Sequence, residues 1–91
     1  MQVSSSAREV FDNLVFNLIK EENSLYTKLD YFMNLKVKAG ERLMTLGASE
    51  ENIKRCITQC QTLDNVMEPL IEEHQKVVTK LKTFGIVVKH S

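Results

Sequence analysis

The sequence predicts an all-α fold: an antiparallel helical hairpin or a three-helix bundle with coiled-coil character, completed by self-association. The main observation is a seven-residue repeat that runs without a slip through the second half of the chain. Because such a repeat aligns one apolar seam along a helix, we expect this segment to pack lengthwise on a second helix. Its positions are Ile53, Cys56, Cys60, Leu63, Met67, Leu70, His74, Val77, Leu81 and Phe84, all apolar except His74.

Further apolar residues flank this seam, at Ile57, Val66, Ile71 and Val78. A stripe this wide exceeds the seam of a two-stranded coiled coil and is typical of a helix in a bundle. Residues 6–46 and 50–84 would form helices of about 60 Å and about 53 Å, so the two arms match in length. These stripes are wider than one hairpin covers, which favours a second copy or a partner helix as the missing neighbour.

The chain has 91 residues and is expected to form one helical domain, 1–91. A domain this small buries a modest share of its surface, so its core is expected to be completed by a partner. Twelve basic residues balance twelve acidic ones, and the two signs are interleaved. We therefore expect neither nucleic acid nor an anionic membrane as a partner.

The first arm, 6–46, is predicted to begin at a capping box in which Ser6 caps the first turn and Glu9 bonds back, leaving residues 1–5 frayed. An amphipathic stripe follows, but the polar run 20–24 interrupts it. Either the helix continues through a stutter, or Ser24 caps a new helix after a short turn. Continuity is favoured because the run contains no Gly or Pro. The stripe comprises Ala7, Val10, Phe11, Leu14, Val15, Leu18 and Ile19 and resumes at Leu25, Tyr26, Leu29, Phe32, Met33, Val37, Leu43 and Met44.

Glycines and one proline punctuate the rest of the chain. Gly40 is interpreted as a small residue for close helix approach, as a local weakening, or as a helix end. Gly47 fits a left-handed C′ position and Ser49 fits an N-cap, which predicts a tight turn at 47–49. Pro69 predicts a kink near residues 65–68. Gly85 ends the second arm, 50–84, and the tail 85–91 is expected to lie against an apolar surface or a partner.

No constellation in the sequence predicts chemistry. Cys56 and Cys60 share a face with His74, but His74 lies about 20 Å further along the helix, so we expect no metal site. The two cysteines are expected to be reduced and buried. His74 is expected to be hydrogen-bonded or partly exposed, with pH sensing as an alternative. We expect no enzyme activity, no cofactor and no small-molecule substrate.

The predicted function is that of a non-enzymatic helical protein–protein interaction module, a structural or scaffolding subunit of a larger assembly. Its partners would be copies of itself or other helical proteins. The predicted partner-binding residues are Leu63, Met67, Leu70 and Ile71, on both sides of Pro69. A kinked helix leaves side chains near its kink for another chain to cover. The alternative is that these four residues fill the intramolecular core.

A second functional hypothesis rests on a resemblance. The run Glu22-Asn23-Ser24-Leu25-Tyr26 with Leu29 and Lys36 resembles the small helical chaperones of flagellar and type III export. It covers under a quarter of the chain and assigns no residue roles. The resemblance implies an adaptor or chaperone that binds an amphipathic segment of a client. A signal-peptide pattern and a long apolar run are absent from the sequence, so a soluble, cytoplasmic protein is expected.

Overall fold

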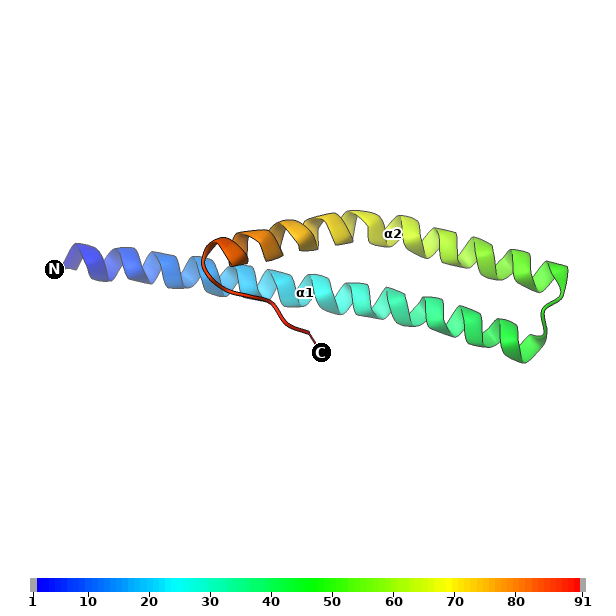
Figure 1. The fold of residues 1–91 in the computed structure, drawn as a ribbon. Coiled ribbons are helices and arrows are strands. Elements are labelled where there is room, and N and C mark those ends of the chain that lie inside the picture. Colours follow the sequence, from blue (N-terminus) through cyan, green and yellow to red (C-terminus); the bar gives the residue numbers. More distant parts are fainter. Residues whose placement is uncertain (1, 91) are drawn as a thin grey trace.

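The computed structural model describes residues 2–90, with side chains from residue 6 onward. Two helices, α1 (Gln2–Leu46) and α2 (Glu50–Thr83), run antiparallel and are followed by a short non-helical tail (Figure 1). The molecule is long and narrow, with principal extents of 71 × 21 × 15 Å. The predicted all-α hairpin is confirmed, in its two-helix form.

Helix α1 is continuous through residues 20–24, so the predicted alternative of a turn there is wrong. The predicted stutter is wrong as well, because the residues of α1 that face α2 follow each other in steps of three and four without interruption. Charged Glu22 and Lys36 occupy two positions of this seam, which explains why the apolar stripe looks broken in the sequence. The buried and half-buried seam residues are Val15, Leu18, Glu22, Leu25, Leu29, Phe32, Lys36, Ala39 and Leu43, in steps of three and four.

Helix α2 turns its predicted seam toward α1: Met67, Val77 and Leu81 are buried, and most of the other seam residues are half-buried. Three contacts between the helices fix their register. The rings of Phe11 and Phe84 meet edge to face at 5.2 Å. Nε2 of His74 lies 2.7 Å from Oε2 of Glu22, and the Cys56 thiol donates to the carbonyl of Ala39 at 3.7 Å. The two residue numbers of each pair add up to 95 or 96. In antiparallel helices this sum stays constant along the pair when the register does not shift, so α1 and α2 keep one register from Phe11 to Ala39.

The turn between the helices has the predicted chemistry. Gly47 has φ +93°, in the left-handed region, and its N–H donates to the Leu43 carbonyl at 3.0 Å. This bond satisfies a carbonyl that the end of α1 would otherwise leave without a partner. Ser49 caps α2, because its hydroxyl accepts from the N–H of Asn52 at 3.2 Å. The turn therefore stops one helix and starts the next within three residues.

A second glycine ends α2 and reverses the chain. Gly85, at φ +79°, donates to the Lys82 carbonyl, and the N–H of Ile86 donates to the Leu81 carbonyl. This pair of bonds is a Schellman motif, which usually brings with it an apolar contact across the turn. Ile86 and Val88 indeed pack against the cluster of Leu18, Leu25, Val77 and Leu81. The tail thus turns back toward α1, as Figure 1 shows.

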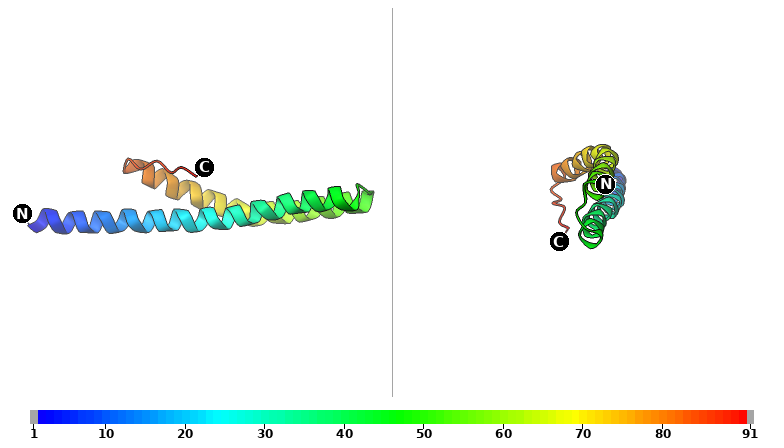
Figure 2. Two further views of the ribbon diagram at one scale, coloured as in Figure 1. Left: turned by 90° about the horizontal axis from the view of Figure 1, so that it is seen from below. Right: turned by 90° about the vertical axis from the view of Figure 1, so that its right-hand side faces the viewer.

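Three local predictions are corrected or narrowed by the structure. Helix α1 begins at Gln2, so Ser6 does not cap it. Residues 2–5, which the sequence predicted to be frayed, are helical, and Met1 lies outside the described residues. The helix does not end at Gly40, and a Cβ there would meet no atom within 4 Å, so close approach does not require a glycine. Pro69 lies inside α2, which curves in its yellow part without breaking (Figures 1 and 2).

Neither α1 nor α2, over the residues described, is both long and apolar enough to cross a membrane.

Candidate interaction face and Glu-His-His cluster

The hairpin buries little of its apolar surface. Among the described residues, the buried apolar side chains are Leu18, Leu25, Ala39, Met67, Val77 and Leu81. The accessible surface of the chain is 7248 Å². A compact monomer of 10.5 kDa exposes about 5,400 Å², so this chain exposes about 1,800 Å² more. The extended hairpin with exposed apolar residues therefore offers an interaction surface.

Exposed apolar side chains gather on one side of the seam. On α1, Ile19 and Met33 are fourteen residues apart and share one row, and Val37 and Met44 form a second row beside it. On α2, Ile57 and Ile71 are likewise fourteen residues apart, with Asp64 midway between them. The ion pair between Lys36 Nζ and Asp64, at 2.7 Å, joins this row of α2 to the same side of α1. We call this side the apolar face; its exposed members are Phe16, Ile19, Met33, Val37, Met44, Ile57 and Ile71.

The opposite side of the seam carries fewer of the exposed apolar side chains, among them Leu14, Tyr31 and Val66. A groove of about 320 Å³ lies there between the helices, and Lys38 and Arg42 of α1 line it together with Gln59 and Thr62 of α2. Its remaining lining residues are Leu35, Ala39, Thr58 and Leu63.

The four predicted partner-binding residues fall into two groups. Met67 is buried against α1, and Leu63 and Leu70 are half-buried in the same seam. Ile71 points out of the seam, with 43% of its surface exposed, and belongs to the apolar face. Their contact with a partner stays a prediction, and only Ile71 offers a largely accessible side chain for it.

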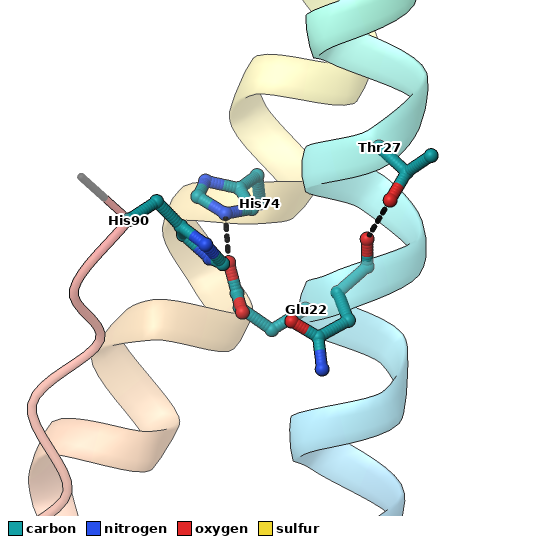
Figure 3. A network of polar contacts seen from close by, with 5 residues as sticks. Glu22, Thr27, His74 and His90 are labelled. Carbon is teal, nitrogen blue, oxygen red and sulfur yellow. Dashed lines mark hydrogen bonds and ion pairs between the residues drawn. The ribbon is translucent and has the colours of Figure 1, made fainter.

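A cluster of one carboxylate and two imidazoles lies in the seam. Glu22 is only 3% exposed, and its Oε2 lies 2.7 Å from Nε2 of His74 and 2.5 Å from Nε2 of His90. The three residues come from α1, α2 and the tail (Figure 3). A buried carboxylate is stabilised by hydrogen bonds from charged or neutral donors, and both imidazoles are placed to donate to it. His74 is thus hydrogen-bonded and partly exposed, in line with the first of the two sequence interpretations.

The tail places His90 by packing as well as by hydrogen bonding. The His90 ring stacks on the Tyr26 ring, with centroids 3.7 Å apart and planes 9° apart. Tyr26 lies midway between Ile19 and Met33, in the row that these two residues form on the apolar face. The tail therefore covers one part of that face and leaves the rest open.

The second charged seam position and the cysteines form another polar layer. Lys36 is the charged residue of this layer. The hydrogen bond that Lys36 donates to Asp64 raises the pKa of Lys36, and the negative charge of the Asp64 carboxylate raises it further. Burial raises the pKa of the Cys60 thiol, and the adjacent Cys56 thiol raises it further. Both cysteines are unpaired and lie in the seam, but they are half-buried, whereas the sequence predicted buried side chains. A thiol with a raised pKa is a weak nucleophile near neutral pH.

Sequence reasoning missed Glu22 and His90. In the sequence Glu22 falls in the polar run 20–24, although steps of three and four back from Leu43 pass through it. His90 carries no periodic signal, because it reaches the cluster only through the Gly85 turn. No protein-family model matches the chain, and neither the curated proteins nor the solved structures contain a significant match.

Proposed function

We propose that this chain is a non-enzymatic helical interaction module that functions as a structural or scaffolding subunit, with a second copy of itself covering the apolar face. The observation that carries the proposal is the excess of exposed surface, about 1,800 Å² per chain over a compact monomer. A stable protein complex of standard size buries about 800 Å² on each partner. The excess is ample for such an interface.

The choice of a second copy rests on the shape and the charge of this face. The exposed apolar side chains of this face extend along both helices, so the face matches in length the same face of a second copy, and two hairpins packed through it would form a four-helix bundle. The formal net charge of the chain is zero, so two copies approach without net repulsion. An isologous pair of this kind needs no further partner to close.

The proposal is tested by placing charges on the face without touching the seam. Val37→Glu with Ile71→Glu adds two carboxylates to exposed positions, 56% and 43% accessible, one on each helix. We expect the helix content to be unchanged and the mass in solution to fall to that of a monomer, because burying these charges in an interface is costly.

A matched control places the same charges on the opposite side. Tyr31 lies one heptad before the groove residue Lys38, and Val66 lies one heptad after the groove residue Gln59. Tyr31→Glu with Val66→Glu, at 60% and 43% exposure, should leave association unchanged. Equal behaviour of the two double variants in multi-angle light scattering would contradict the proposed face. A monomeric wild type that binds one client peptide would instead support the adaptor or export-chaperone hypothesis.

A further inference from the structure

We propose that Glu22, His74 and His90 form a binding site for a divalent transition-metal ion of the zinc type, which fastens the tail to the hairpin. The potential ligand atoms, one carboxylate oxygen and two imidazole nitrogens, all lie within 4.8 Å of one another. Nitrogen and carboxylate ligands suit Zn²⁺, whereas Mg²⁺ and Ca²⁺ prefer oxygen alone.

The spacing of the three atoms fits the ion after a small adjustment. Zinc binds imidazole nitrogen and carboxylate oxygen at about 2.0–2.2 Å, so ligands at tetrahedral angles lie about 3.3 Å apart. The two Nε2 atoms are 2.7 and 2.5 Å from Oε2, so each of these two pairs has to separate by about 1 Å or less. The ligand nitrogens of the two imidazoles lie within 4.8 Å of each other and have to reach the same spacing. Side-chain rotation supplies this movement, because His90 belongs to a non-helical segment and the imidazoles are partly exposed.

The proton inventory is simple. In the hydrogen-bonded cluster without metal, the Nε2 atom of each imidazole carries a proton that points toward Oε2 of Glu22. The metal ion takes the place of these protons, and each neutral imidazole then carries its proton on Nδ1. Three protein ligands leave a fourth position of a tetrahedral ion for water or for a ligand from another molecule.

The surroundings hold the ligands in place from both sides. The Tyr26 ring fixes the plane of the His90 ring by stacking on it. Glu22 is held between the two helices, with its side chain 4% exposed. Ile86 and Val88 anchor the segment that carries His90 to the apolar cluster beneath it. Since one ligand comes from the tail, metal binding would stabilise the tail over Tyr26, on the part of the apolar face that it covers.

The test uses the full chain with Cys56→Ala and Cys60→Ala, so that thiolates cannot bind the added metal. Titration with Zn²⁺ in a calorimeter should give one ion per chain, and Co²⁺ should give the visible absorption of a tetrahedral nitrogen and oxygen site. His90→Ala should weaken Zn²⁺ binding at least tenfold and abolish the Zn²⁺-dependent rise in melting temperature. Helix content should not change, because His90 lies outside both helices.

Lys89→Ala is the matched control, because it alters the neighbouring exposed tail residue and leaves all three ligands in place. It should change Zn²⁺ affinity less than twofold. Glu22→Gln keeps a hydrogen-bonding oxygen but removes the charge, and it should weaken binding about as much as His90→Ala. If the wild-type cluster binds Zn²⁺ no more tightly than the His90→Ala chain does, the site is a hydrogen-bonded cluster only and the proposal is wrong.

Discussion

The polar layer at Glu22 makes a sharp prediction about stability. Glu22→Leu replaces a buried carboxylate with an apolar side chain of similar volume, at a seam position where leucine fits the heptad. It also removes the acceptor for Nε2 of His74 and of His90. Sequence periodicity alone would predict that the leucine stabilises the hairpin. The structure predicts the opposite sign.

The magnitude follows from what the two imidazoles lose. Leaving a buried donor without a partner costs about 1–3 kcal/mol. The side chains of His74 and His90 remain 21% and 24% exposed, so water partly replaces the lost acceptor and each cost lies near the lower end. A buried leucine returns about 1 kcal/mol of this through apolar contact. The two costs together are about 2–3 kcal/mol, so after the return from leucine we expect Glu22→Leu to lower the free energy of unfolding by about 1–2 kcal/mol.

The assay is urea unfolding followed by circular dichroism, at a fixed protein concentration because association changes apparent stability. Glu21→Leu is the matched control, since Glu21 is the exposed neighbour and its replacement should change stability by less than about 0.5 kcal/mol. The double variant Glu22→Leu with His74→Leu restores an apolar layer and should recover much of the loss. If Glu22→Leu is as stable as the Glu21→Leu control, or more stable, the cluster contributes nothing and the reasoning fails.

Three further predictions follow from single positions. Gly40→Ala should raise the free energy of unfolding by about 0.5–1 kcal/mol in urea titration, because a Cβ there meets no atom within 4 Å and alanine favours a helix; a loss would show that the site needs glycine. Leu81→Ala should cost about 2–5 kcal/mol in the same titration, because Leu81 is fully buried under the tail, and a cost below 1 kcal/mol would contradict this packing. Burial raises the pKa of the Cys60 thiol, so as pH rises the unfolded chain loses the thiol proton at a lower pH than the folded chain does. The free energy of unfolding should therefore fall as pH rises above the ordinary thiol pKa. Replacing Cys60 with alanine should reduce that alkaline slope, leaving the part that the raised pKa of Lys36 contributes, and an unchanged slope would exclude the thiol as a cause.

The sequence was most informative where periodicity and turn chemistry act together. The seam of α2 is apolar at every position but His74, and Gly47 and Ser49 have the residue types that a helix end and a helix start require. The seam of α1 was harder to see, because Glu22 and Lys36 hide it. Charged residues at such positions are tolerated only with partners, and the partners His74 and Asp64 lie on the other helix.

The cluster and the apolar face depend on contacts that no local pattern encodes. His90 reaches Glu22 across 68 positions of sequence, through a turn that Gly85 permits and a tail that Ile86 and Val88 anchor. The apolar stripes of both helices were visible in sequence, but their assignment to one side required the inter-helix register. That register is shown by the Phe11–Phe84, Glu22–His74 and Ala39–Cys56 contacts, which bring together residues of opposite helices.

The central claim is that a second copy of the chain covers the apolar face, and the mass of the wild-type protein in solution tests it most directly. Sedimentation equilibrium over a range of micromolar concentrations should give a species of twice 10.5 kDa that dissociates on dilution. A monomer of 10.5 kDa at every concentration, together with cooperative unfolding, would show that the hairpin is stable alone and would contradict the account.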